Sequence, residues 1–407
     1  MSALLWPGDN RAGEIFADGA VLDAMVATEA AWLSALVDAG IAPRSATTES
    51  LAVVGPDDAA RVAAEAEAGG TPVAPVLALL RARLGGHEAA TWLHRGLTSQ
   101  DVLDTALMIC ARDAVAQLRP ALQTQTAALA ELADAHRNTP MIARTLTQHA
   151  VPTTFGVKVA TWLHGLLDAV ADLDALRFPV QLGGAAGTRA ALFELATLAG
   201  CADPADTVDA VVTRTAQALD LDPAAPWHTT RAPVTRIGDA LVRCTDAWGH
   251  IANDVLVLGR PELGELTEPS GGGSSTMPQK ANPVLAVLLR RAALTAPGVG
   301  MQLHVASASA VDERPDGGWH AEWQPLQLLA RHAVSAAAQA TELITSLRVH
   351  PDRMQANLAA SLPGALAERD SMRALFGADA TAGDDAYLCT GAGLVDAAIT
   401  RAAGKAR

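Results

Sequence analysis

Five segments of this chain place apolar residues at the three- and four-residue spacing of an amphipathic helix, over lengths unusual for a globular protein. In the first of them, Leu107, Leu118 and Leu122 fall on one stripe. Helices of this length bury their apolar faces by packing side by side, so the pattern predicts an all-α fold built on a central bundle of long helices. The expected helices cover residues 101–136, 153–176, 237–258, 284–306 and 321–347.

Breaks rich in glycine, proline and aspartate divide the chain around this bundle, first at residues 55–58 and 68–75. We expect an N-terminal helical domain at 1–103, the bundle at 104–350 and a short C-terminal helical domain at 351–407. Half of the residues are hydrophobic, which excludes a disordered chain. Aromatic residues make up only 3%, which disfavours β-sandwiches and β-barrels.

The charge balance limits the partners of the chain. Its formal net charge is −14, and no basic stripe is present, so we expect no nucleic-acid partner. The sequence begins without a signal-peptide pattern and has no long uncharged apolar stretch, which predicts a cytoplasmic protein without a membrane partner. The cysteines lack the spacing of a metal site, so we expect no metal and buried free thiols. The four cysteines are Cys110, Cys201, Cys244 and Cys389.

The loop GGGSSTMPQKANP at residues 271–283 carries the most distinctive chemistry. Its glycines allow close approach of the backbone to a ligand, while Pro278 and Pro283 stiffen its far end. Lys280 is one of only three lysines in the chain and lies six residues after Ser274. A serine becomes a useful base when nearby cations or amides lower the pKa of its hydroxyl. The alternative is a plain glycine–serine linker.

Four other loops carry polar side chains between the expected helices. The segment at 144–156 contains Gln148 and His149, and the histidine can act as a general acid or base or belong to ordinary helix capping. The segment at 94–101 is typical of a helix cap or of an anion site at a helix start. Its candidate ligands are His94, Thr98 and Ser99.

The remaining two loops pair tryptophan with histidine and an arginine. They are PWHTTR, which contains Arg231, and DERPDGGWHAEW, which contains Arg314. Either arginine can bind a carboxylate through two parallel hydrogen bonds, or can remain an ordinary solvated cation. Tryptophan beside histidine is often simple core packing.

Together these loops resemble the active-site segments of the fumarase/aspartase/argininosuccinate lyase superfamily. Residues 273–283 match its GSSxMPxKxNP signature throughout, and the segments at 98–101 and 145–152 follow in the expected order. Within the superfamily the sequence is similar to the 3-carboxy-cis,cis-muconate cycloisomerases. The superfamily resemblance covers about residues 10 to 350, and the closer likeness to the cycloisomerases rests on TLTQHAVP, QLGGAAGT, PWHTTR and GWHAEW.

This resemblance implies roles for individual residues. Ser274 exchanges a proton at a carbon next to a carboxylate, Lys280 stabilises the aci-carboxylate intermediate, and His149 is the partner near the bond that forms or breaks. Asn282 helps Lys280 to bind the carboxylate. The other implied substrate contacts are Thr98, Ser99, Gln148, Arg231, Arg314, His94, Ser275 and Met277.

The resemblance also implies a reaction and an assembly. The expected activity is lactonisation of 3-carboxymuconate in protocatechuate degradation, the reverse of a β-elimination, without a metal or organic cofactor. The alternatives are a β-elimination lyase for another succinyl-type substrate, such as an amino- or nitrosuccinate or an adenylosuccinate-like compound, and a catalytically silent helical scaffold. Members of the family form homotetramers that bind a small polycarboxylate in sites shared between subunits. The C-terminal domain of this chain looks shortened by comparison.

Overall fold

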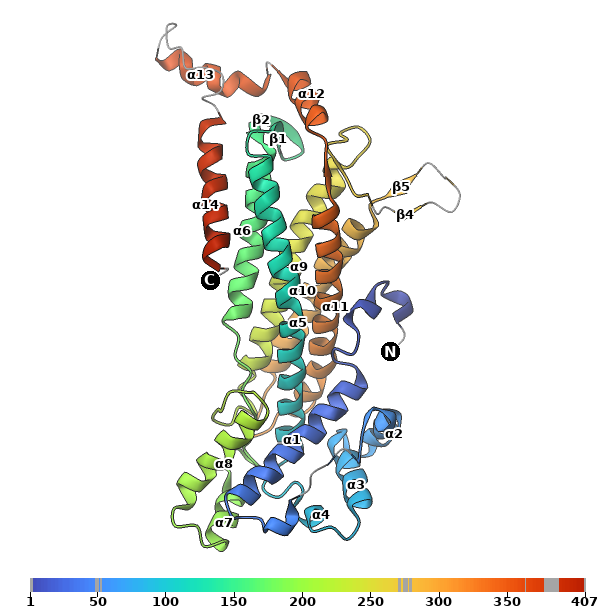
Figure 1. The fold of residues 1–407 in the computed structure, drawn as a ribbon, viewed down its shortest axis with the longest axis vertical. Coiled ribbons are helices and arrows are strands. Elements are labelled where there is room, and N and C mark those ends of the chain that lie inside the picture. Colours follow the sequence, from blue (N-terminus) through green and yellow to red (C-terminus); the bar gives the residue numbers. More distant parts are fainter. Residues whose placement is uncertain are drawn as a thin grey trace. The chain divides into compact units, whose positions relative to one another are not determined.

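The protein is built from long α-helices, as predicted. The computed structural model describes residues 3–47, 51, 53–269, 272–273, 277, 280–362, 364–376 and 388–405. Over this part of the chain it contains fourteen α-helices and six short strands (Figure 1). The five expected long helices are present as α5 Ser99–Ala135, α6 Phe155–Asp174, α9 Ala232–Leu258, α10 Val284–Ala308 and α11 Gly318–Ser346.

Shorter elements join and flank these helices. The remaining helices are α1 Asp18–Asp38, α2 Ala59–Glu65, α3 Val73–Leu84, α4 Ala89–Trp92, α7 Ala190–Leu198, α8 Pro204–Ala218, α12 Pro351–Ser361, α13 Ala367–Leu375 and α14 Cys389–Lys405. The strands are β1 Pro140–Thr145, β2 Gln148–Thr154, β3 Leu266–Thr267, β4 Gly272–Gly273, β5 Ala281–Asn282 and β6 Arg348–Val349. The strands form three antiparallel pairs, β1–β2, β3–β6 and β4–β5.

The chain divides into two compact units. The first contains residues 1–117, 175–239 and 298–332, and the second contains residues 118–174, 240–297 and 333–407. The divisions fall inside α5, α9, α10 and α11, so these four long helices contribute to both units, while α6 lies wholly in the second. The three-domain division expected from the sequence stays a prediction.

In the first unit, α1 packs against α3 and α8. Trp32 and Leu36 of α1 are buried, as is Leu80 of α3. The buried indole Nε1 of Trp32 donates a hydrogen bond to the backbone oxygen of Arg95, 2.8 Å away. This bond ties the segment that leads into α5 to a buried residue of α1.

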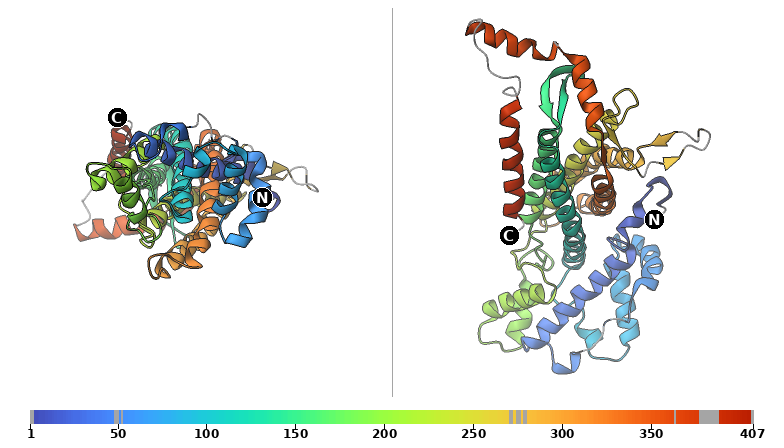
Figure 2. Two further views of the ribbon diagram at one scale, coloured as in Figure 1. Left: turned by 90° about the horizontal axis from the view of Figure 1, so that it is seen from below. Right: turned by 45° about the horizontal axis from the view of Figure 1, so that its top comes forward.

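In the second unit, the segment at 144–156 does not form the expected irregular loop but an antiparallel hairpin that leads into α6 (Figure 2). The two residues between β1 and β2, Leu146 and Thr147, both have positive φ angles, of 47° and 73°. A two-residue turn of this kind matches the twist of the paired strands. Neither residue is a glycine, so the turn signal was hidden in the sequence.

An apolar cluster joins the hairpin to the C-terminal segment. Ile142 of β1 clusters with Leu358 of α12 and with Ala365, and all three side chains are buried. Further along, α14 packs against α6, and the two helices lie side by side in Figures 1 and 2. Helices α12 and α14 therefore belong to the packed body of the second unit.

The cysteines largely follow the prediction. Cys110 and Cys244 are buried free thiols, and burial raises the pKa of each to about 12, so both stay protonated at neutral pH. Cys201 is free and half-buried. The side chain of Cys389 lies outside the described residues.

Two helices, α1 and α10, are long and apolar enough to cross a membrane. This is weak evidence for a membrane span, because the core helices of soluble proteins meet the same criterion.

Two glycines of α6 give a matched test of the packing. A Cβ added at Gly156 would lie 2.6 Å from the Cα of Arg137, whereas one added at Gly165 meets nothing within 4 Å. We expect Gly156→Ala to lower the free energy of unfolding by about 2 kcal/mol because backbone must move. Gly165→Ala should raise it by about 0.5 kcal/mol, the helix-propensity gain. Urea unfolding measures both, and equal effects would contradict the packing described.

Candidate active site

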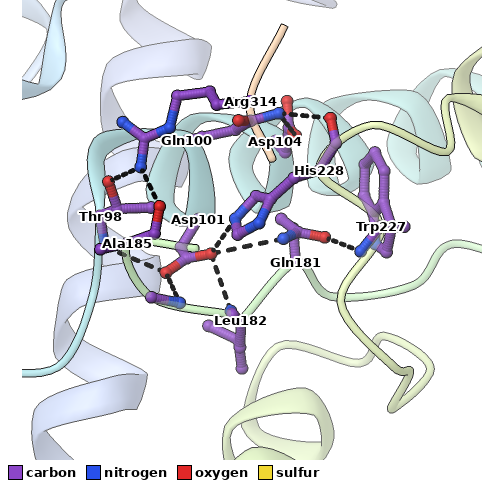
Figure 3. A network of polar contacts seen from close by, with 12 residues as sticks. Thr98, Gln100, Asp101, Asp104, Gln181, Leu182, Ala185, Trp227, His228 and Arg314 are labelled. Atoms are coloured by element: carbon purple, nitrogen blue, oxygen red, sulfur yellow. Dashed lines mark hydrogen bonds and ion pairs between the residues drawn. The ribbon is translucent and has the colours of Figure 1, made fainter. Parts of the chain in front are cut away.

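A buried carboxylate organises the segment at the start of α5. Asp101 accepts hydrogen bonds from the backbone amides of Thr98, Gly183 and Gly184, at 3.0, 2.9 and 2.8 Å (Figure 3). The Nε2 of His228 lies 2.9 Å from the same carboxylate. Because an ionised carboxylate only accepts, the ring of His228 must donate from Nε2. One side chain thus joins the motifs TSQD, QLGGAAGT and PWHTTR.

The glycines of QLGGAAGT allow this close approach. A Cβ at Gly183 would lie 2.7 Å from Cε1 of His228, so a larger residue would push the ring away from Asp101. Gly184 has a φ angle of 70°, which favours glycine, and its added Cβ would lie 3.1 Å from the backbone oxygen of Gly96. Glycine is therefore required at both positions, so that the turn can pack against His228 and Gly96 while its amides bond to Asp101.

Glutamines fix the loop that carries His228. The Oε1 of Gln181 accepts a hydrogen bond from the backbone amide of Trp227 at 2.6 Å. Gln100 Nε2 donates to the backbone oxygen of His228 at 2.9 Å (Figure 3). Both glutamines are fully buried. The PWHTTR loop is therefore held at two adjacent residues, by Gln181 at the amide of Trp227 and by Gln100 at the carbonyl of His228. The Oε1 of Gln100 is itself buried without a hydrogen-bond partner among the described residues.

One turn along α5, a second buried carboxylate holds Arg231. Asp104 accepts two hydrogen bonds from the guanidinium, at 2.7 and 3.0 Å, and Glu322 of α11 accepts two more. The ring of Trp227 lies 4.7 Å from the guanidinium carbon. All three nitrogens of Arg231 are thus used inside the protein, which argues against the substrate contact predicted for this residue.

The charges in this cluster shift two pKa values. Burial alone lowers the pKa of Arg231, but the carboxylates of Asp104 and Glu322 outweigh it and raise that pKa. Burial raises the pKa of Glu322 to about 7; Arg231 opposes this shift and Asp104 adds to it. Two carboxylates facing one cation leave an unbalanced negative charge, which a proton on Glu322 removes near neutral pH.

Arg314 lies beside the start of α5. Its Nη2 donates to the hydroxyl of Thr98 and, at 3.2 Å, to the backbone oxygen of Ala185 (Figure 3). Arg314, Thr98 and the adjacent Ser99 are all half-buried, at the amino end of a long helix. A guanidinium, two hydroxyls and the first amides of a helix suit a carboxylate. His94 instead pairs with buried Glu29, with its Nδ1 2.7 Å from the carboxylate.

The second unit carries the other predicted residues. His149 is exposed on β2, and its Nδ1 lies 2.9 Å from the hydroxyl of Ser361 at the end of α12. The neighbouring Gln148 is exposed and bonds to Thr147. An exposed imidazole on a short, stiff hairpin is well placed for proton exchange with a ligand.

The described residues at the two ends of the signature segment form a short antiparallel pair. Strands β4 and β5 pair Gly272 with Asn282, and Lys280 and Met277 are exposed beyond them. Glu268 accepts hydrogen bonds from the first amides of α10, at 2.8 and 3.0 Å, where a carboxylate favours the positive helix end. Ser274 and Ser275 lie outside the described residues.

The predicted residues thus fall into two groups, each within one unit. His94, Thr98, Ser99, Arg231 and Arg314 belong to the first unit, and Gln148, His149, Met277, Lys280 and Asn282 to the second. Sequence reasoning missed the residues that support them. Asp101 and Asp104 are spaced three apart on one helix face, which was a usable signal, whereas nothing local marked Ser361. Among the described residues, no cluster of histidine, cysteine, aspartate and glutamate could hold a metal ion.

Glu322 gives the first unit a testable pH dependence. Its pKa is about 7 in the folded protein against 4.5 ordinarily, so between these values the folded chain binds more protons than the unfolded one. The free energy of unfolding should therefore fall as pH rises through this interval. Glu322→Gln should flatten this slope, while Glu194→Gln, an exposed control on α7, should keep it. Urea unfolding at about pH 5 and about pH 8 measures the slope, and an unchanged slope in Glu322→Gln would refute this assignment.

Comparison with known proteins identifies the family of the chain. The lyase family model matches residues 14–298. Nitrosuccinate lyase of Streptomyces davaonensis is 44% identical over 84% of this chain and 73% of its own length. The 3-carboxy-cis,cis-muconate cycloisomerase of Pseudomonas aeruginosa is 37% identical over 88% of this chain and 78% of its own.

Solved structures show the same fold. The 3-carboxy-cis,cis-muconate lactonizing enzyme of Pseudomonas putida has a TM-score of 0.81 at 30% identity, covering 97% of this chain and 86% of that one. A fumarate lyase of Mesorhizobium has a TM-score of 0.77 at 27% identity, covering 96% and 97%. This chain therefore belongs to the lyase family and is an enzyme of the fumarase/aspartase superfamily.

Proposed function

We propose that the enzyme is a β-elimination lyase that acts on nitrosuccinate or a closely similar substituted succinate. The observation that carries this proposal is the 44% identity to a nitrosuccinate lyase, against 36–37% for cycloisomerases over similar shares of the chain. It favours the reading that the sequence left as an alternative. The intact signature loop and His149 argue against the catalytically silent scaffold.

The reaction follows from the substrate's bonds. A base removes the proton from the carbon next to one carboxylate, and the electron pair is held as an aci-carboxylate. That pair then forms the carbon–carbon double bond while the carbon–nitrogen bond breaks, and the bonding electrons leave with the nitro group as nitrite. The products are fumarate, nitrite and a proton on the enzyme base, so the electron count balances without an oxidant or reductant.

The residues divide this work by charge. Ser274 removes the proton, and Lys280 with Asn282 holds the doubly charged aci-carboxylate, a role that needs a fixed cation and fixed donors. Thr98, Ser99 and Arg314 bind a substrate carboxylate at the amino end of α5. His149 exchanges a proton near the leaving group. No resident metal or organic cofactor has a part in this scheme.

A second candidate is the cycloisomerase reaction. Here a carboxylate of 3-carboxymuconate adds to the diene to close a lactone, and the same loop protonates the carbon. The structural similarity to the lactonizing enzyme of Pseudomonas putida, a TM-score of 0.81 over nearly the whole chain, favours it. The two reactions share the aci-carboxylate intermediate and differ in the group that leaves or attacks.

A direct assay separates the two candidates. Purified enzyme given nitrosuccinate should release nitrite and fumarate in equal amounts, followed by colorimetric nitrite detection and by the absorbance of fumarate. With 3-carboxymuconate we expect no loss of diene absorbance. The converse pattern, with diene loss and no nitrite, would replace the proposal by the cycloisomerase, and Ser274→Ala serves as the inactive control for either substrate.

We further propose that the enzyme is a homotetramer whose sites draw residues from different subunits. On α10, Val287, Leu294 and Met301 repeat every seven residues and are each at least half exposed. A seven-residue apolar repeat on a long helix favours packing against further helices. Other subunits would then cover this stripe. We also propose that the enzyme is cytoplasmic.

Complementation tests the shared sites. Lys280→Met and His149→Gln should each lower kcat at least ~10²-fold, because each removes a preorganised charge or proton-exchange group. When the two inactive proteins are mixed and their subunits exchanged, activity should return, since some sites then combine an intact lysine with an intact histidine from separate chains. Light scattering should give a tetramer for every variant. A mixture that stays inactive despite proven exchange would contradict shared sites.

A further inference from the structure

The C-terminal segment supplies a hydrogen-bond partner to His149. Ser361 is the last residue of α12, and its hydroxyl lies 2.9 Å from Nδ1 of the imidazole. The same hydroxyl donates to the backbone oxygen of Asn357, one turn earlier, at 2.8 Å. The serine thus stands between a carbonyl, which can only accept, and a ring nitrogen, which can do either.

The proton count then fixes the state of the ring. A serine hydroxyl has one hydrogen, and the carbonyl of Asn357 takes it. Towards the ring, the hydroxyl can therefore only accept, so Nδ1 of His149 must carry the hydrogen. The other arrangement would set two lone pairs against each other at 2.8 Å. In the neutral ring Nε2 is then the nitrogen with the free electron pair.

The surrounding contacts keep this geometry stiff. Arg144 of the hairpin makes two hydrogen bonds to Glu265, at 3.1 and 2.7 Å, and Glu265 is fully buried. Asn357 donates to the same carboxylate at 2.7 Å. The apolar cluster of Ile142 and Leu358 joins β1 to α12 beside these bonds. The hairpin that bears His149 and the helix that bears Ser361 are therefore held together by charge and by packing.

We propose that Ser361 is a positioning residue that keeps the neutral ring of His149 in the Nδ1–H form, so that Nε2 is the nitrogen that takes up or returns a proton. The assigned role in turnover rests on the proposed function, but the tautomer itself does not. The C-terminal segment, which sequence analysis expected only as a shortened domain, thereby contributes to the active site.

A serine elsewhere in the same unit provides a matched control. Ser346 ends α11, is half-buried like Ser361, and donates to the backbone oxygen of Glu342, four residues earlier, at 2.7 Å. Ser346→Ala therefore removes the same helix-end bond without removing a histidine partner. Ser361→Thr keeps the hydroxyl, whereas Ser361→Ala removes it.

The test reads the ring directly. Full-length protein labelled with ¹⁵N in the histidine rings is studied by magic-angle-spinning NMR above the titration of the ring, and the His149 signals are identified by their loss in His149→Gln. We expect a protonated Nδ1 and an unprotonated Nε2 in the wild type, in Ser361→Thr and in Ser346→Ala. Ser361→Ala should shift the population towards Nε2–H. An Nε2–H ring in the wild type, or an unchanged ring in Ser361→Ala, would overturn the proposal.

Kinetics add the functional part. Ser361→Ala should lower kcat about tenfold with little change in KM, less than loss of the imidazole itself, because the ring remains but its protonation is no longer fixed. Ser361→Thr should restore kcat, and Ser346→Ala should match the wild type. If nitrosuccinate is not a substrate, the NMR result still decides the tautomer, so failure of the proposed function and failure of this inference remain distinct.

Discussion

The carboxylate of Asp101 is the interaction on which the first unit depends. It is fully buried, and backbone amides from two separate segments, together with the ring of His228, converge on it. A buried charge is costly unless its lone pairs are filled, so these partners are obligatory. Asp104, one turn further on, holds Arg231 in the same way. The segments that carry Thr98, His228 and Arg231 are therefore held by these two buried carboxylates.

The groups assigned to proton exchange are held differently. His149 is exposed on a hairpin, and Lys280 is exposed beyond the short pairing of β4 with β5. Two buried carboxylates hold the segments that carry these groups. Glu265 bonds to Arg144 of the hairpin, and Glu268 accepts from the first amides of α10. Exposed reactive groups on buried ionic supports can meet a substrate while keeping their direction, which β-elimination through a short-lived dianion requires.

The sequence predicted the long helices well because their apolar spacing is a local signal. It did not predict the β1–β2 hairpin, since Leu146 and Thr147 adopt positive φ angles without glycine. For Arg231 it identified a bidentate cation, but its partners proved to be Asp104 and Glu322. These carboxylates are 127 and 91 residues away, so pairing of this kind depends on the tertiary fold. The same holds for Ser361, which is 212 residues from His149.

Amide hydrogen exchange at Gly183 and Gly184 measures how far the carboxylate of Asp101 holds this loop. Asn at position 101 would keep the shape of the side chain but replace one acceptor oxygen with a donor and remove the charge. We predict that Asp101→Asn speeds exchange of both amides by about tenfold or more, while the amides of α14, in the second unit, keep their wild-type rates. Wild-type exchange at both glycines in this variant would show that something other than the carboxylate holds the loop, and would contradict the role assigned to Asp101.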